Sequence, residues 1–339
     1  SYSNEFKFTL IQNTVNNSRF QTDELLKASI EIQNAQEDAI LLEKKLYSQI
    51  CNDINKSSQD VYVISKKIAF IDVITNFANL AIIKNFVKPN LIEETSLDIV
   101  GGRHPVVEES LLRKSQEFTP NDCKMNSENF AWLMTGPNMA GKSTFLRQVA
   151  IIIIMNQIGS FVPADSANIG VFDKIFTRIG ASDNLSKGMS TFMTEMVETS
   201  RILNEATKNS LVILDELGRG TSTEDGLAIA QAVLEYILMK INCLTLFATH
   251  FKQLCFLADH YNSLNLKTLK IKKWNDEIVF LYKLIDGISE GSFGIHVASM
   301  AGIKKPILER SRKILQKINP DKSLNKELID KDSFNNKTE

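Results

Sequence analysis

The sequence predicts an α/β domain with a mostly parallel sheet, preceded by a region of long helices. Three short apolar runs, at 130–135, 211–214 and 244–248, suit strands that are buried on both faces of a parallel sheet. A glycine-rich motif at 136–143 stands between the first of these runs and a helical pattern. By contrast, residues 22–84 contain neither Gly nor Pro and repeat their apolar residues at helical spacing.

The helical region begins at Thr22, which we expect to be the N-cap because two acidic residues follow it in the first turn. The first helix is predicted to run to about Ile54. Its apolar stripe consists of Leu42, Leu46, Ile50 and Ile54. The polar segment NKSSQD, at 55–60, predicts a break, after which a second helix continues to about Lys84. The two helices form either a strut or lever, or a plain helical hairpin, and periodicity does not choose between these alternatives.

The character of the sequence changes near Pro89, so the boundary with the α/β domain is expected between residues 85 and 97. The first residues, SYSNEFKFTL, have neither an initiator Met nor a signal-peptide pattern, which suggests that the chain begins inside a longer protein. After Asn319 the chain is polar and lacks sustained periodicity, as is typical of a flexible tail or linker.

Composition excludes several classes of protein. The 39 basic residues nearly cancel the 40 acidic ones, so any contact with nucleic acid must be local. The four cysteines lie far apart, so neither a disulfide framework nor a Cys/His metal site is indicated, and a reduced, cytosolic setting fits best. The apolar run 149–155 is much shorter than the ~20 residues that a membrane span needs. We therefore predict no membrane association and a buried helix at this run.

The motif GPNMAGKS, at 136–143, matches the phosphate-binding P-loop pattern and has the strand and helix that this loop requires on either side. Its glycines allow backbone N–H groups to turn toward phosphate oxygens at a helix N-terminus. Lys142 supplies a positive charge for the β and γ phosphates, and the Ser143 hydroxyl is a ligand for Mg²⁺. The predicted nucleotide-binding residues of the motif are Gly136, Pro137, Asn138, Met139, Ala140, Gly141, Lys142 and Ser143.

Two further strand ends carry polar residues. The run SLVILDE ends in Asp215, a candidate for the Mg²⁺ shell, and Glu216, a candidate for polarising the attacking water. Such acids also commonly cap the next helix, but the preceding P-loop and the glycine-rich LGRGTST that follows favour the catalytic role. The run LTLFA leads to His250, which is expected to sense the γ-phosphate or the water.

The segment GASDNLSKGMSTFMTEM, at 180–196, has a polar front half and a helical back half that begins near Ser190 and Thr191. Ser190 either caps this helix or presents its hydroxyl and the helix N-terminus to a phosphate. Sequence spacing leaves both alternatives open.

Together, TGPNMAGKSTFLRQ, RIGASDNLSKGMSTFMTEM, LDELGRGTSTEDG and LFATH resemble the ATPase of the MutS family in order and spacing. The resemblance extends upstream through EFTPND, GGRHPVVE and LLEKKLY, and downstream through GSFGIHVASMAGIKKPILERSRKIL. It implies an Mg²⁺-dependent ATPase with a P-loop NTPase fold like that of ABC ATPases. The resemblance also implies the domain order: end of a clamp at 1–21, lever helices at 22–96, ATPase at 97–285, a helix-turn-helix dimerisation element at 286–318, and a tail at 319–339.

The resemblance further implies a homodimer with composite sites, in which Ser190 reaches the γ-phosphate bound by the partner and residues 218–223 cross the interface. Phe118 lies where the family stacks an aromatic ring on adenine. Ala140 replaces a glycine of many relatives, and we expect ATP binding to survive this change. Nothing in these 339 residues resembles the family's mismatch-reading domain or most of its clamp, so we expect this chain by itself to hydrolyse ATP better than it recognises mismatches.

For the intact protein, the family implies mismatched DNA as a partner, conversion to a sliding clamp, recruitment of a MutL-type protein, and a bacterial, cytoplasmic, nucleoid-associated location. Two alternatives stay open. The chain is a nucleotide-binding dimerisation fragment with little turnover, or it comes from a paralogue that acts on recombination intermediates.

Overall fold

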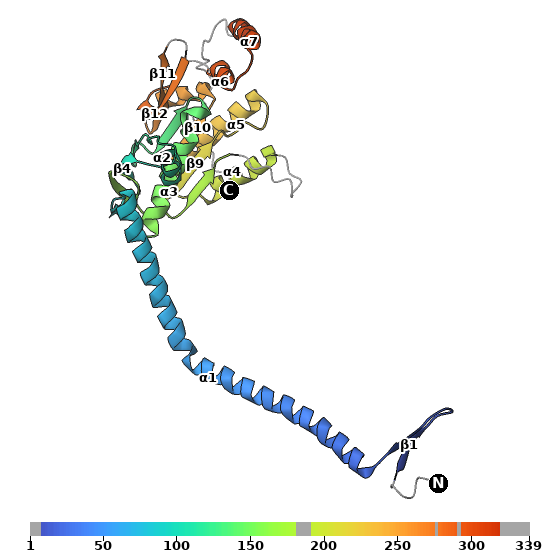
Figure 1. Ribbon diagram of the computed structural model, residues 1–339. Coiled ribbons are helices and arrows are strands. Elements are labelled where there is room, and N and C mark those ends of the chain that lie inside the picture. The colour runs from blue at the N-terminus through green and yellow to red at the C-terminus, as the bar shows by residue number, and fades with distance from the viewer. Residues whose placement is uncertain (1–7, 181–190, 275–276, 290–292, 319–339) are drawn as a thin grey trace, which may run out of the picture. The chain divides into compact units, whose positions relative to one another are not determined.

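The computed structural model describes residues 8–180, 191–274, 277–289 and 293–318 (Figure 1). Its contacts divide the chain into two compact units, 1–76 and 77–339. The predicted α/β class is confirmed by a six-stranded, mostly parallel sheet in the second unit and by a long helix that precedes it. The domain limits drawn from the family resemblance stay predictions.

The first unit begins with a hairpin of β1 (Thr9–Asn13) and β2 (Ser18–Gln21), which pair antiparallel. Helix α1 (Asp23–Lys84) follows and continues into the second unit. The predicted N-cap is confirmed, because the hydroxyl of Thr22 accepts a hydrogen bond from the N–H of Leu25 at 3.1 Å. The predicted apolar stripe of α1 is exposed in the described structure.

The predicted break at 55–60 is wrong, because α1 runs through this segment as one helix of 62 residues. The helical hairpin that we kept as an alternative is therefore wrong as well. Polar residues lower helix propensity only slightly, and neither Gly nor Pro is present to interrupt the backbone hydrogen bonds. The polar side chains instead bond within the helix, as when Ser58 donates to the carbonyl of Asn55 and Lys56 pairs with Asp53.

The six-stranded sheet has the order β12-β11-β6-β10-β9-β8. Its strands are β6 (Ala131–Thr135), β8 (Ile175–Arg178), β9 (Leu211–Asp215), β10 (Leu244–Thr249), β11 (Leu264–Trp274) and β12 (Glu277–Asp286). All neighbours are parallel except the β11–β12 pair. The three predicted strands are confirmed as β6, β9 and β10, and every residue of these three is buried.

A second sheet, of order β3-β7-β4-β5, was not predicted. It is formed by β3 (Asn90–Ile92), β4 (Leu97–Gly102), β5 (Asn121–Met125) and β7 (Ser166–Gly170). Its pairs are antiparallel except for β3 with β7. These strands are short and half exposed, so their sequences show no continuous apolar run.

The helices of the second unit lie between its strands along the chain, except for α6 and α7, which follow the last strand (Figure 1). They are α2 (Pro105–Leu112), α3 (Lys142–Gln157), α4 (Thr191–Glu205), α5 (Thr223–Tyr236), α6 (Gly294–Met300) and α7 (Lys305–Ile318), with short helical turns η1 (Asn138–Ala140), η3 (Ile237–Ile241) and η4 (Lys252–Asp259). The apolar run 149–155 lies in α3, and most of it is buried, as predicted. No described helix is long and apolar enough to cross a membrane.

Candidate nucleotide-binding and active site

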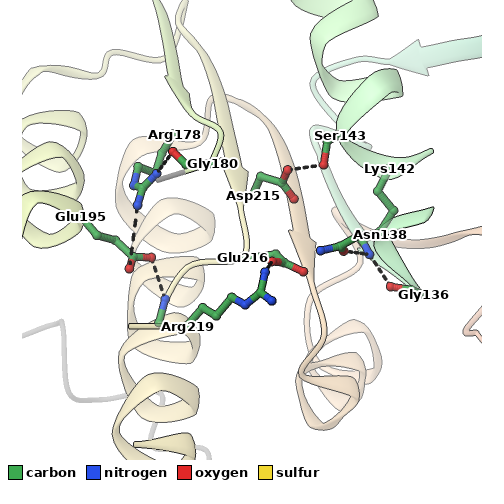
Figure 2. Close-up of polar contacts among 11 residues, drawn as sticks. Gly136, Asn138, Lys142, Ser143, Arg178, Gly180, Glu195, Asp215, Glu216 and Arg219 are labelled. Atoms are coloured by element: carbon green, nitrogen blue, oxygen red, sulfur yellow. Dashed lines mark hydrogen bonds and ion pairs between the residues drawn. The ribbon is translucent and has the colours of Figure 1, made fainter. Parts of the chain in front are cut away.

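Three polar strand ends meet at one edge of the six-stranded sheet. Thr135 at the end of β6 aligns with Thr249 at the end of β10, and Ala248 of β10 aligns with Asp215 at the end of β9. The P-loop follows Thr135, Glu216 follows Asp215, and His250 follows Thr249. Because parallel strands end at the same edge, the three predicted motifs follow strands that end there. Figure 2 shows the P-loop residues beside Asp215 and Glu216.

The P-loop backbone needs its glycines. Gly136 and Gly141 have φ angles of +126° and +101°, which side-chain-bearing residues rarely adopt. Gly141 is the N-cap of α3, so the first N–H groups of that helix lack helical partners at the loop. Ala140 is fully buried, and its methyl group is accommodated inside the loop. This geometry suits a phosphate at the start of α3.

Lys142 is folded back into the loop. Its ammonium group donates to the carbonyl of Gly136 and, at 2.8 Å, to Oδ1 of Asn138 (Figure 2). The side chain is fully buried, and this burial lowers the pKa of Lys142, although the nearby acids Glu216 and Asp215 oppose the shift. Two oxygens of the loop therefore hold the cation where phosphate oxygens are predicted to bind.

Ser143 and Asp215 form an oxygen pair beside the loop. The hydroxyl of Ser143 donates to Oδ2 of Asp215 at 2.5 Å. Oδ1 of the same carboxylate is buried and has no hydrogen-bond partner among the described residues. Burial raises the pKa of Asp215, and the bond from Ser143 opposes this shift. A hydroxyl and a carboxylate with an unused oxygen fit Mg²⁺, which prefers oxygen ligands.

Glu216 has a left-handed backbone, with φ +60°, although it is not a glycine. Its N–H donates to the carbonyl of Ala248, which ties the residue to the end of β10. Its carboxylate accepts a hydrogen bond of 2.5 Å from the guanidinium of Arg219 (Figure 2). Arg219 is exposed, so solvent weakens this ion pair and the carboxylate can be released at little cost.

The structure gives fewer contacts for the remaining predicted residues, which are His250, Phe118 and Ser190. His250 is exposed, its ring lies 4.1 Å from that of Phe251, and desolvation by its surroundings lowers its pKa. Phe118 is half-buried in the loop between α2 and β5, and no hydrogen bond or ring contact among the described residues joins it to the P-loop. Ser190 lies outside the described residues, as does the tail 319–339.

The protein-family model for MutS domain V matches residues 132–319, which is more than half of the chain. The chain belongs to the MutS domain V family. The DNA mismatch repair protein MutS of Rickettsia akari is 51% identical over 311 residues, which are 92% of this chain and 35% of the relative. The proteins of the same name from Rickettsia felis and Rickettsia bellii are 50% and 49% identical over similar lengths. The chain thus spans about a third of the length of these relatives, and MutS domain V is an ATPase domain, as the resemblance implied.

Within the MutS domain V fold, a cavity of about 460 Å³ opens at the carboxyl edge of the sheet. Four predicted residues line it, namely Asn138, Ser143, Asp215 and Glu216. Four further charged residues line it, namely Arg147, Arg178, Glu195 and Arg219, of which only Arg219 belongs to a segment with a predicted role, the interface segment 218–223. Arg178 and Glu195 stand in the motif RIGASDNLSKGMSTFMTEM, and their burial is the feature that periodicity does not reveal.

Tyr282 is a further neighbour of the P-loop that sequence reasoning missed. A Cβ atom added to Gly141 would lie 3.3 Å from a ring carbon of Tyr282. The residue interrupts β12 with a φ angle of +54°, and its carbonyl accepts from the side chain of Asn121, three residues after Phe118. Both aromatic residues thus belong to segments joined by this bond. No local sequence signal marks Tyr282, since it stands 141 positions after Gly141.

Proposed function

We propose that this chain binds Mg·ATP in the cavity at the carboxyl edge of β6, β10 and β9 and hydrolyses it, as the ATPase part of a DNA mismatch repair protein. The observation that carries the proposal is the convergence of Lys142, Ser143, Asp215 and Glu216 on that edge. These residues supply a cation that binds the phosphates, two oxygen ligands for the metal ion, and a carboxylate that polarises the attacking water. Phosphoryl transfer requires these parts.

On ATP binding, the phosphates replace Gly136 and Asn138 as partners of the Lys142 ammonium. Ser143 and Asp215 would hold Mg²⁺ through their side-chain oxygens, and the ion would neutralise charge that develops on the phosphates. Glu216 leaves Arg219 and accepts a hydrogen bond from the attacking water. His250, at the end of β10, contacts the same water or the γ-phosphate. Phe118 stacks on the adenine, and Tyr282 borders the nucleotide from the P-loop side.

Asp215→Asn tests the metal site. The amide keeps the size of the side chain but removes its charge, so we expect the Mg²⁺ concentration for half-maximal turnover to rise by at least about tenfold. A titration of Mg²⁺ at fixed ATP measures this change. Asp173→Asn is the matched control, because the Asp173 carboxylate, like that of Asp215, accepts hydroxyl hydrogen bonds but precedes β8 at the opposite edge of the sheet. An unchanged Mg²⁺ requirement in Asp215→Asn contradicts the assignment.

The proposed active unit is a homodimer formed through the ATPase domain and the helix-turn-helix region, in which Ser190 reaches the γ-phosphate of the partner. Two helices, α6 and α7, occupy most of that region and are compatible with such an element. ATPase activity per chain should therefore rise with chain concentration.

Ser190→Ala should lower turnover at high concentration without weakening ATP binding by the monomer. Equal losses of turnover and of binding would place Ser190 in its own chain's site.

In the intact protein, we propose that the nucleotide cycle couples recognition of mismatched DNA to a sliding clamp and to a MutL-type partner, in a bacterial cytoplasm near the nucleoid. The relatives named as DNA mismatch repair proteins support this assignment over a recombination paralogue.

One observation favours a second candidate for the isolated chain, a nucleotide-binding module with little turnover. The hydrogen bond from Arg219 occupies the Glu216 carboxylate, so this carboxylate does not face an attacking water in the arrangement that the structure shows.

A further inference from the structure

A buried carboxylate on α4 reaches the loop that follows Glu216. Glu195 is 4% exposed, and its Oε1 accepts a hydrogen bond of 2.9 Å from the backbone N–H of Gly218. Its Oε2 lies 4.0 Å from a guanidinium nitrogen of Arg178, at the end of β8 (Figure 2). Burying a carboxylate is costly, so this placement requires compensating contacts.

Arg178 provides that compensation from a second buried position. It is 7% exposed, donates to the carbonyl of Gly180, and has its Nε 3.1 Å from a carboxylate oxygen of Glu198. Glu198 is half exposed and follows Glu195 by three residues, one turn along α4. Arg178 thus has two acidic partners, and it retains one of them if Glu195 is replaced.

The loop that Glu195 holds is closely packed at its glycines. Gly218 has φ +86°, and a Cβ at this position would lie 2.5 Å from the carbonyl oxygen of Gly226 on α5. A Cβ at Gly220 would lie 3.0 Å from the Cβ of Phe192 on α4. Arg219, between these two glycines, donates to Glu216. The loop is therefore clamped between α4 and α5 on both sides of the residue that contacts the predicted catalytic carboxylate.

From this arrangement we infer that Glu195 is a positioning residue for hydrolysis, with Arg178 as its buried counter-ion. It fixes the amide of Gly218, the fixed loop sets the backbone of Glu216, and the carboxylate of Glu216 is thereby aimed into the cavity that Glu195 also lines. The inference rests on the proposed function and deepens it. Lys142 and Ser143 take their contacts from the P-loop and Asp215, so Glu195 affects hydrolysis and not the holding of the nucleotide.

Glu195→Ala leaves the buried amide of Gly218 without its acceptor. We expect kcat to fall by about ten- to a hundredfold, the range for loss of a charged hydrogen bond, while KM for ATP changes by less than about threefold. Glu195→Gln keeps an acceptor oxygen and should retain most of the kcat. The matched control is Thr199→Val, one turn further along α4, because Thr199 is also buried but its hydroxyl donates within the helix, to the carbonyl of Glu195. Equal kcat values for Glu195→Ala and Thr199→Val overturn the inference.

Hydrogen exchange of the Gly218 amide tests the contact without any turnover. In Glu195→Ala this amide should exchange at least about tenfold faster than in the unmodified chain, while amides of β9 keep their rates and Thr199→Val matches the unmodified chain. An unchanged rate at Gly218 overturns the inference even if the variant is less active. Failure of the proposed function gives a different result, because the unmodified chain then does not hydrolyse ATP. The exchange rate of the Gly218 amide tests the Glu195 contact independently of that outcome.

Discussion

Glu216→Gln is expected to lower kcat for ATP hydrolysis by about 10²- to 10⁴-fold, the usual contribution of general-base catalysis. The substitution keeps the size of the side chain and removes the charge that orients and polarises the water. The affinity for Mg·ATP should change by less than about threefold, because the proposed nucleotide contacts of Lys142 and Ser143 are untouched. Steady-state phosphate release gives kcat, and titration calorimetry gives the affinity.

Glu128→Gln provides the matched control for this substitution. Glu128 is exposed and precedes β6, at the edge of the sheet opposite to the cavity, so both kcat and affinity should stay unchanged. A Glu216→Gln chain that hydrolyses ATP as fast as the unmodified chain contradicts the assignment of Glu216. If that variant instead loses ATP binding, Glu216 is part of the binding site and not the base.

Lys142→Ala should weaken the binding of Mg·ATP by about a hundredfold or more, because the buried ammonium is the principal cation that the P-loop offers to the phosphates. The same variant without nucleotide should unfold at nearly the same temperature as the unmodified chain. Burial of the Lys142 cation has a cost, visible as its lowered pKa, so its removal offsets the loss of the bonds to Gly136 and Asn138.

Lys208→Ala is the control for Lys142→Ala, since Lys208 is an exposed lysine that precedes β9 at the opposite edge of the sheet. Titration calorimetry of both variants with Mg·ATP compares the affinities, and thermal unfolding compares the folded chains. Equal affinities in Lys142→Ala and Lys208→Ala would mean that nucleotide does not bind at the P-loop.

The central sheet and the P-loop could be predicted because each depends on a short continuous segment. A strand buried on both faces gives an unbroken apolar run, as in β6, β9 and β10, and the glycines with positive φ are part of a fixed motif. Since parallel strands end at one edge, the meeting of Lys142, Asp215 and Glu216 followed from these local signals.

Features that depend on distant pairing were missed. The sheet of β3, β4, β5 and β7 joins four short segments between residues 90 and 170, and its half-exposed strands carry no apolar run. The buried pair of Arg178 and Glu195 comes from a strand and a helix separated by the segment 181–190. Tyr282 lies beside the P-loop although 141 positions separate it from Gly141 in the sequence. In α1 the prediction instead added a break that does not exist. The polar segment 55–60 contains neither Gly nor Pro, and such a segment does not end a helix.

Single-turnover hydrolysis tests the central claim most directly. The chain, in excess over labelled ATP and at a concentration high enough for dimer formation, is mixed with Mg²⁺, and bound ATP and ADP are separated over time. We predict that bound ATP is converted to ADP and that chelating Mg²⁺ stops the conversion. Bound ATP that is never converted, conversion that continues without Mg²⁺, or no bound ATP at all would contradict an Mg²⁺-dependent ATPase site in this cavity.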